Sequence, residues 1–170
     1  VRRSILLDSK ADLVVFGMGE KPILEIARRL AAGETVRALR DMRGVAYRLG
    51  AGEPPPAGDD TVELPSCEDS AADPSAFCRL TRLAHQETNP YNARRLTQRH
   101  GREVVVVNPP GLPLTPPEID RVYDLPYTRL PHPSYGRMKI PAFEVVRTSV
   151  QIMRGCFGGC TFCSITAHEG

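Results

Sequence analysis

The chain has 170 residues, of which 25% are charged and 41% are hydrophobic, and its formal net charge is +2 at pH 7. This near-neutral balance argues against a nucleic-acid-binding protein, and no apolar run reaches the roughly 18 residues of a membrane span. We therefore expect a cytoplasmic globular protein that binds neither nucleic acid nor membrane.

The first predicted elements are a strand and a helix. Residues 13–16 form a continuous apolar run, which is typical of a strand buried on both faces. Pro22 suits the first turn of the following helix, and Gly33 is placed to end it. Between them, apolar side chains recur on one helix face: Ile23, Ile26, Ala27 and Leu30.

Two glycines, Gly17 and Gly19, stand between this strand and this helix. Such a turn could cradle a phosphate at the helix N-terminus. However, Glu20 would already satisfy the helix dipole, and the third glycine of a dinucleotide-binding turn is absent. We therefore favour a packing role for both glycines.

A second strand is predicted at 44–49, before a loop at 50–60. A strand, a helix and a further strand in this order are typical of a doubly wound α/β sheet. We interpret residues 1–64 as the tail of a Rossmann-like N-terminal domain.

A helix and a hairpin are predicted next. Asp73 can cap the helix, with Pro74 at its first position, and the apolar face ends before Asn89. Cys78 has the spacing of a small core residue on this helix, and His85 is expected on its surface. Cys67 falls in the preceding loop, and neither of these cysteines is expected to bind a metal cluster.

The predicted hairpin has strands at 95–99 and 103–108, which flank His100-Gly101. Within it, Val104 to Val107 are the most apolar segment of the chain, and we expect them to form an inner strand.

Nine of the sixteen prolines lie between Pro109 and Pro141, interrupted by a predicted short helix at 117–123. Proline fixes φ and removes a hydrogen-bond donor, so this stretch should be extended and semi-rigid. A Pro-x-x-Pro ligand for another protein is the alternative interpretation. We assign residues 65–142 to a helix, a hairpin and a proline-rich connector.

The alternation of apolar and polar residues from 145 to 153 predicts a strand that leads into a cysteine loop. In this loop Cys156, Cys160 and Cys163 have the spacing C-x3-C-x2-C. A [4Fe-4S] cluster normally takes four thiolates, so three close ones would leave one iron open to a small molecule. Gly158 and Gly159 are expected to allow the tight turn between the first two sulfurs because glycine tolerates positive φ.

Two other kinds of site remain open at these cysteines. His168 could complete a Cys3His zinc site, which would make the chain a zinc-organised binding module. A closed cluster would make it an iron-sulfur electron-transfer protein, although such proteins usually supply four cysteines. Disulfides are a poor alternative because the chain has five cysteines and no secretory segment is visible.

The pattern C-x3-C-x-aromatic-C resembles the signature of radical S-adenosylmethionine (radical SAM) enzymes. The surrounding sequence resembles the YgiQ-type branch, bacterial proteins with no assigned reaction. The similar stretches are 11–30, 98–101, 108–110, 125–127, 131–133 and 152–170.

The resemblance implies a fold, cofactors and site residues. The fold is a partial (β/α)6 barrel, a TIM-type arrangement whose first strand and cluster loop would be residues 143–170. The cofactors are a [4Fe-4S] cluster, held by Cys156, Cys160 and Cys163, and S-adenosylmethionine, which is cleaved to a 5′-deoxyadenosyl radical. Phe162 would contact the adenine or shield the cluster, with a plain core role as the alternative.

The resemblance also implies an electron donor of the flavodoxin or ferredoxin type. Residues 1–64 resemble the last unit of a cobalamin-binding-like domain, but no Asp-x-His-x-x-Gly motif is present. The chain starts without Met and ends seven residues after Cys163. We therefore expect an internal fragment of a longer protein, inactive by itself, whose remaining barrel would supply the substrate pocket.

Overall fold

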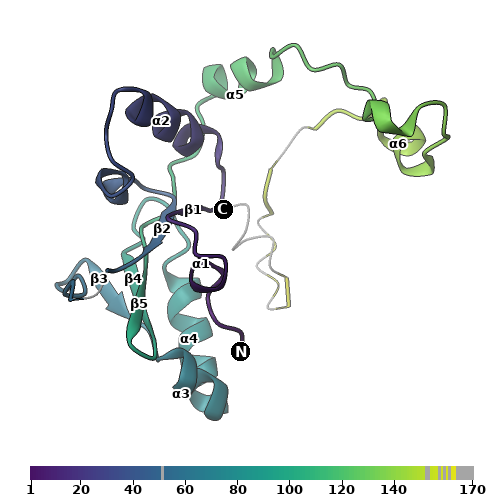
Figure 1. Cartoon of the computed structure of the whole chain (residues 1–170). Coiled ribbons are helices and arrows are strands. Elements are labelled where there is room, and N and C mark those ends of the chain that lie inside the picture. The colour runs from purple at the N-terminus through teal and green to yellow at the C-terminus, as the bar shows by residue number, and fades with distance from the viewer. Residues whose placement is uncertain (51, 152–153, 157, 159, 161, 164–170) are drawn as a thin grey trace. The chain divides into compact units, whose positions relative to one another are not determined.

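The computed structural model describes residues 1–50, 52–151, 154–156, 158, 160 and 162–163. This part of the chain is a mixed α/β structure with one five-stranded sheet (Figure 1). The strands are β1 Val14–Val15, β2 Val45–Arg48, β3 Thr61–Glu63, β4 Arg95–His100 and β5 Glu103–Val107. The helices are α1 Ile5–Asp8, α2 Glu20–Ala31, α3 Cys67–Ala72, α4 Pro74–Gln86, α5 Pro116–Tyr123 and α6 Pro141–Val146, with short 3-10 helices η1 Ala38–Asp41 and η2 Pro133–Tyr135.

The strand order in the sheet is β1-β2-β5-β4-β3. Strands β4 and β5 are antiparallel because a tight turn joins them, and Gly101 in that turn has a φ of +60°. Strands β3 and β4 are parallel because α3 and α4 form the crossover between them. The central position of β5 confirms the predicted inner strand, and the β4–β5 pair confirms the predicted hairpin.

The doubly wound arrangement predicted for residues 1–64 is not confirmed. A doubly wound sheet consists of parallel strands, whereas β1 pairs antiparallel with β2 and β2 pairs antiparallel with β5. Val15, at the end of β1, pairs with Val45, at the start of β2, so α2 and η1 return the chain to the same end of the sheet. The strand–helix–strand unit with parallel strands lies further along, at β3 to β4.

Strand β2 carries apolar packing on both faces of the sheet. On one face, Ala46 and Val105 pack with Leu6 and Leu7 of α1. On the other face, Val45 packs with Leu39 of η1, with Met42, which follows η1, and with Ile26 of α2. Neighbouring residues of a strand point to opposite faces, so α1 and α2 cover the two sides of the same strand.

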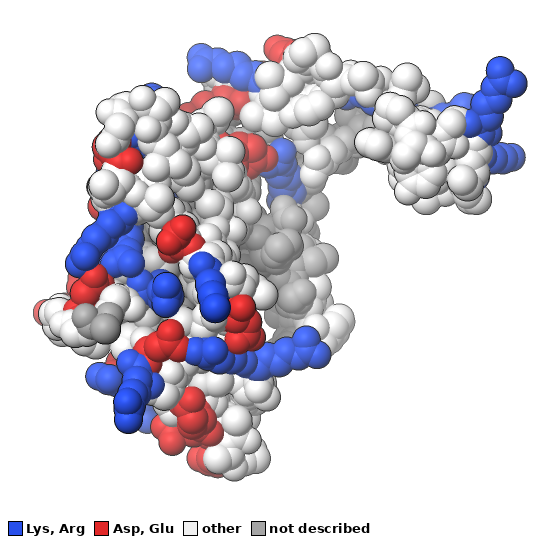
Figure 2. All heavy atoms as spheres, viewed as in Figure 1, with Lys and Arg blue, Asp and Glu red and all other residues white. Residues whose placement is uncertain are grey.

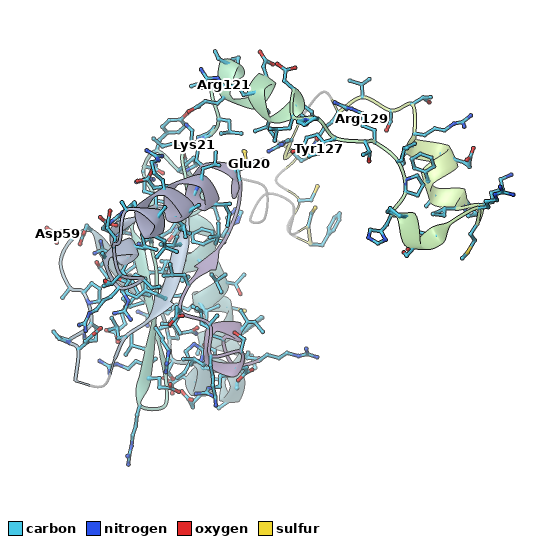
Figure 3. All side chains as sticks on the ribbon, turned by 45° about the horizontal axis from the view of Figure 1, so that its top comes forward. Glu20, Lys21, Asp59, Arg121, Tyr127 and Arg129 are labelled. Carbon is cyan, nitrogen blue, oxygen red and sulfur yellow. The ribbon has the colours of Figure 1, made fainter. Side chains whose placement is uncertain are left out.

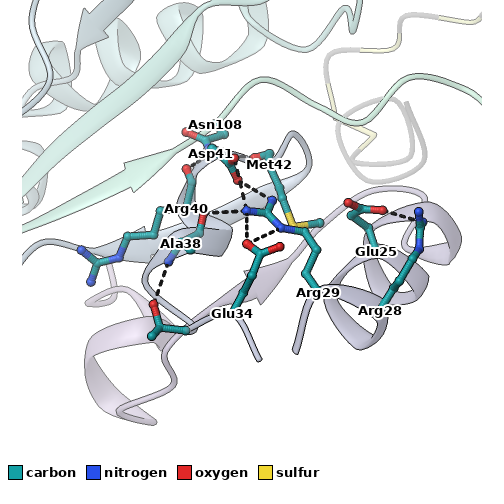
Figure 4. A network of polar contacts seen from close by, with 10 residues as sticks. Glu25, Arg28, Arg29, Glu34, Ala38, Arg40, Asp41, Met42 and Asn108 are labelled. Atoms are coloured by element: carbon teal, nitrogen blue, oxygen red, sulfur yellow. Dashed lines mark hydrogen bonds and ion pairs between the residues drawn. The ribbon is translucent and has the colours of Figure 1, made fainter. Parts of the chain in front are cut away.

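Asn108, which follows β5, forms hydrogen bonds to η1 and to the residue after it. Its side chain is buried, and its Nδ2 atom donates to the carbonyls of Arg40 at 2.8 Å and Met42 at 2.7 Å. Arg29 joins α2 to the same region, because it donates to Glu34 at 2.9 Å and to Asp41 at 2.7 Å (Figure 4). These polar contacts satisfy backbone and side-chain groups where the packing of α2 and η1 meets the sheet.

The helix ends predicted from the sequence are confirmed in α2 and α4. Gly33 follows α2 with a φ of +87°, and its N–H donates to the carbonyl of Leu30 at 3.0 Å. Asp73 caps α4, because its carboxylate accepts from the backbone of Ser75 at 2.9 Å and of Ala76 at 3.2 Å. The short helix predicted at 117–123 is also confirmed, as α5.

Two cysteine predictions are wrong. Cys78, predicted in the core, is exposed on α4, a helix without a buried residue. Cys67, predicted in a loop, is the first residue of α3 and is buried. Ser66 caps α3 through its side chain, which accepts from the backbone N–H of Asp69 at 3.0 Å. The helix is only six residues long and therefore has little periodicity.

The strand predicted at 145–153 is not present in residues 145–151, and residues 152–153 lie outside the described part of the chain. Pro141 begins α6 instead, and α6 runs through Val146. A strand needs a neighbouring strand for its backbone N–H and C=O groups, and the described residues provide none here. The partial barrel is therefore not confirmed.

The described chain divides into two compact units. Residues 1–113 belong to one unit together with the described residues of the cysteine loop, and the described residues of Leu114–Arg154 form the other. In the second unit, Arg129 follows α5 and donates to the carbonyl of Tyr123 at 3.0 Å. Tyr127 and Arg129 extend from the segment between α5 and η2 (Figure 3). This segment contains no strand, as expected for a proline-rich connector.

His100 is a buried residue at the end of β4, with 6% of its surface exposed. Among the described residues, neither ring nitrogen has a hydrogen-bond partner. Burial lowers the pKa of His100 below its usual range. The charges that act on it are Glu68, Glu103 and Asp8, which raise the pKa, and Arg3, which lowers it.

We expect His100 to make the fold less stable as the pH falls below about 6.5. A buried histidine with a lowered pKa binds its proton more readily in the unfolded chain, so acid favours unfolding. His100→Phe should remove this part of the pH dependence, measured as the unfolding midpoint in urea between pH 7.5 and pH 5.5. The exposed His85 provides the control. If His85→Phe flattens the pH dependence as much as His100→Phe, burial of His100 is not the cause.

Candidate functional site

The cysteine loop brings two sulfurs to one glycine. The backbone N–H of Gly158 donates to Sγ of Cys156 at 3.3 Å, and Sγ of Cys160 lies 3.8 Å from the carbonyl oxygen of Gly158. A Cβ atom at Gly158 would lie 3.3 Å from the first sulfur and 3.7 Å from the second. A side chain at Gly158 would therefore be tight against the Cys156 sulfur and in ordinary contact with the Cys160 sulfur.

The role of the loop glycines differs from the prediction. Gly158 is not among the glycines with positive φ, so its close approach to the Cys156 sulfur, and not an unusual backbone conformation, is what favours glycine there. The positive φ in this loop, +77°, belongs to Gly155, immediately before Cys156. Gly159 lies outside the described residues.

A backbone hydrogen bond joins Cys163 to Cys160. The N–H of Cys163 donates to the carbonyl of Cys160 at 3.0 Å. Cys156 and Cys160 are exposed, and Cys163 is half-buried. Within the described residues, however, no three His, Cys, Asp or Glu side chains are grouped closely enough to hold a metal ion. The structure thus places two of the three predicted ligands beside Gly158 and does not group all three.

Of the two other predicted site residues, Phe162 is described by the structure and His168 is not. Phe162 is 91% exposed, so its side chain is not part of the core that the structure describes. His168, the alternative fourth ligand, lies outside the described residues. The donor atoms nevertheless suit an iron-sulfur cluster, because thiolate sulfurs are its usual protein ligands and exposed ones are accessible to iron.

The two glycines before α2 have structural roles. Gly17 has a φ of +69°, which glycine tolerates in the turn between β1 and α2. A Cβ at Gly19 would lie 3.5 Å from Val15, which is ordinary packing distance. Figure 3 shows Glu20 and Lys21 at the start of the helix. The packing role predicted for Gly17 is not supported, because a Cβ there would meet nothing within 4 Å. The positive φ explains this glycine, and the contact at Gly19 is an ordinary one.

The first unit contains a cavity of about 590 Å³ that could not be read from the sequence. Five arginines line it, and they come from η1 and the residue before it, from β2 and from the β4–β5 hairpin. They are separated by up to 65 positions along the chain, so no sequence motif links them. The nearest signal in the sequence is the pair of arginines at 99 and 102, on either side of His100-Gly101.

A family model described as Radical SAM N-terminal matches residues 1–149 of the chain. The chain belongs to the Radical SAM N-terminal family. This match ends seven residues before Cys156, so membership does not rest on the cysteines. No solved structure matches the chain.

Relatives of this Radical SAM N-terminal chain are UPF0313 proteins, and the alignments extend over all of it, including the cysteine loop. It is 53% identical to UPF0313 protein RPA0679 of Rhodopseudomonas palustris and 55% identical to UPF0313 protein GSU2873 of Geobacter sulfurreducens, and it covers 28% of each. It is 42% identical to the UPF0313 protein YgiQ of Salmonella typhimurium and covers 31% of it. The chain thus spans less than a third of these relatives.

The helices of the described residues include none with the length and apolar character needed to cross a membrane.

Proposed function

We propose that the cysteine loop holds a [4Fe-4S] cluster through Cys156, Cys160 and Cys163 in a radical SAM enzyme. The observation that carries this proposal is the approach of two sulfurs to Gly158, within a C-x3-C-x2-C sequence. Membership of the Radical SAM N-terminal family supports it independently. Three thiolates leave one iron without a protein ligand, and S-adenosylmethionine would bind there.

When bound, the reduced cluster supplies the electron that cleaves S-adenosylmethionine to methionine and a 5′-deoxyadenosyl radical. The chain's own contribution is to hold the thiolates and to orient them. The N–H of Gly158 supports the Cys156 sulfur, because a hydrogen bond to a cluster sulfur stabilises its negative charge. Phe162, an exposed ring beside Cys163, would contact the adenine of the cofactor. The electron would come from a flavodoxin or ferredoxin type of partner.

We further propose that residues 143–170 begin a partial barrel that the remaining length of the protein completes. The relatives are more than three times as long as this chain, which supports a larger catalytic unit. In that unit a neighbouring strand would be available to the alternating residues 147–151. The substrate pocket would then belong to the rest of the protein.

The test is the electron paramagnetic resonance spectrum of the reduced full-length protein, before and after addition of S-adenosylmethionine. We expect the spectrum to change, because new nitrogen and oxygen ligands at one iron alter the electronic structure of the cluster. An unchanged spectrum would favour an electron-transfer protein. Zinc in the metal analysis, with no sulfide and no spectrum, would favour a zinc-organised binding module.

His168→Ala separates an open from a closed cluster. His168 is five residues after Cys163 and is the histidine placed to occupy the fourth iron. If the cluster is open, this variant and the parent protein should respond equally to S-adenosylmethionine. A response in the variant alone would mean a Cys3His cluster, and the proposed cofactor site would then be wrong.

Gly158→Ala should weaken cluster binding. The added Cβ would lie 3.3 Å from the Cys156 sulfur, so the sulfur would have to move away from the position that the loop gives it. Gly158→Val should have a larger effect, because it adds two further methyl groups at the same place. The measurement is iron and acid-labile sulfide per protein after anaerobic reconstitution. Equal loading of all three proteins would show that the space beside Gly158 is not needed.

A further inference from the structure

Five arginines converge on one cavity of the first unit, which we call the arginine cavity. It has a volume of about 590 Å³, within the range of roughly 300 to 1,000 Å³ that is typical of small-molecule sites. Basic side chains gather over the sheet in this part of the surface, with acidic ones among them (Figure 2). The arginines of the cavity are Arg37, Arg40, Arg48, Arg99 and Arg102.

Three carboxylates line the same cavity, so positive charge is in excess. They are Asp12, Glu53 and Glu103. The negative charge of Glu103 is partly balanced by a residue outside the cavity, because Glu103 also forms an ion pair with Arg3. The arrangement therefore retains guanidinium groups that its own acids do not neutralise.

The cavity already binds one carboxylate, which belongs to the chain itself. Oε2 of Glu53 accepts from Nη1 of Arg40 at 2.9 Å and from the backbone N–H of Gly50 at 3.1 Å. Arg37 forms an ion pair with the other oxygen. The Gly50 N–H and the two arginines hold the pKa of Glu53 below its usual range, although partial burial opposes this. The geometry of an anion site is thus built into the fold.

Two further guanidinium groups remain available in the arginine cavity. Arg48 lies 3.9 Å from Glu103, a long ion pair that leaves its donors largely unused. Arg102 is exposed and has no hydrogen bond or ion pair to any described residue. Arg40 is fixed from the other side, where its guanidinium lies 5.0 Å from the centre of the Tyr47 ring.

We propose that the arginine cavity binds a small molecule that carries a phosphate group. A phosphate offers more charge and more acceptor oxygens than a carboxylate, and the planar donors of arginine match it. Arg48 and Arg102 contribute the unused donors, and the phosphate competes with the Glu53 carboxylate for Arg37. No described residue of the cysteine loop lines the cavity, and the proposal does not depend on a cluster.

The test is calorimetric titration of the full-length protein with tripolyphosphate at constant ionic strength. We expect saturable binding, and the double variant Arg48→Gln/Arg102→Gln should weaken it about tenfold or more, as the loss of charged hydrogen bonds predicts. The matched control is Arg82→Gln/Arg121→Gln, which removes the same charge from exposed positions outside the cavity. This control should bind as the parent protein does.

A second variant is expected to strengthen tripolyphosphate binding instead of weakening it. Glu53→Gln should strengthen tripolyphosphate binding, because it removes the competing carboxylate, whereas Glu144→Gln changes the same charge elsewhere and should not. Circular dichroism shows whether each variant is folded. No saturable binding, equal weakening by both double variants, or equal strengthening by both glutamine variants would overturn the proposal. Each of these results would leave the cluster proposal unaffected.

Discussion

Replacing Cys156, Cys160 or Cys163 with alanine is expected to abolish the iron-sulfur cluster of the full-length protein. Two remaining thiolates would leave two irons without a protein ligand, and a cubane normally takes four cysteines. The measurement is iron and sulfide content after anaerobic reconstitution, together with absorption in the visible region. Loss should be nearly complete in each variant. A variant that keeps its full cluster would remove that cysteine from the ligand set.

The remaining two cysteines provide the control. Cys67 is buried at the start of α3 with its sulfur 3.9 Å from the carbonyl oxygen of Arg2, and Cys78 is exposed on α4. Cys67→Ala and Cys78→Ala should leave iron and sulfide content unchanged. Loss of iron in either variant would mean that a ligand lies outside the C-x3-C-x2-C loop.

Asn108→Leu is expected to destabilise the first unit by about 2 to 4 kcal/mol, because each buried polar group left without a partner costs about 1 to 3 kcal/mol. Leucine has a similar size but cannot donate to the carbonyls of Arg40 and Met42, which Asn108 now satisfies at 2.8 and 2.7 Å. The measurement is protection of β5 and η1 amides from hydrogen exchange, which reports on this unit alone.

Asn92→Leu is the matched control for this variant. Asn92 is exposed, and none of its side-chain atoms has a hydrogen bond in the described structure. The same substitution there should change stability by less than about 0.5 kcal/mol. Similar losses at the two positions would show that the buried hydrogen bonds of Asn108 contribute little.

The sequence predicted local structure well where a chemical signal marked it. Asp73 and Pro74 located the start of α4, Gly33 located the end of α2, and the valine run of β5 indicated an inner strand. The direction of strand pairing was harder to predict. The segment between β1 and β2 looks like a crossover, but η1 adds a further turn that brings the chain back antiparallel.

For the candidate site, the sequence supplied the donor atoms and not their arrangement. The spacing of the cysteines predicted the ligand set, and the structure added that a side chain at Gly158 would lie closely against the Cys156 sulfur. The arginine cavity could not be predicted, because its walls come from segments that the sheet alone brings together. The strand predicted in residues 145–151 is not present, because alternation of apolar and polar residues indicates a preference for extended structure. It does not show that a neighbouring strand is available for pairing.

The central place of β5 has a consequence for the order in which the protein folds. Strand β2 precedes β5 by more than fifty residues, and its second edge has no partner until Val105–Val107 have been synthesised. The hairpin of β4 and β5 closes over a short loop and can form quickly, whereas pairing with β2 must close a long one. On the ribosome, the N-terminal third of the chain would therefore emerge with an unfinished sheet. The sheet would be completed from its C-terminal hairpin toward its N-terminal strands.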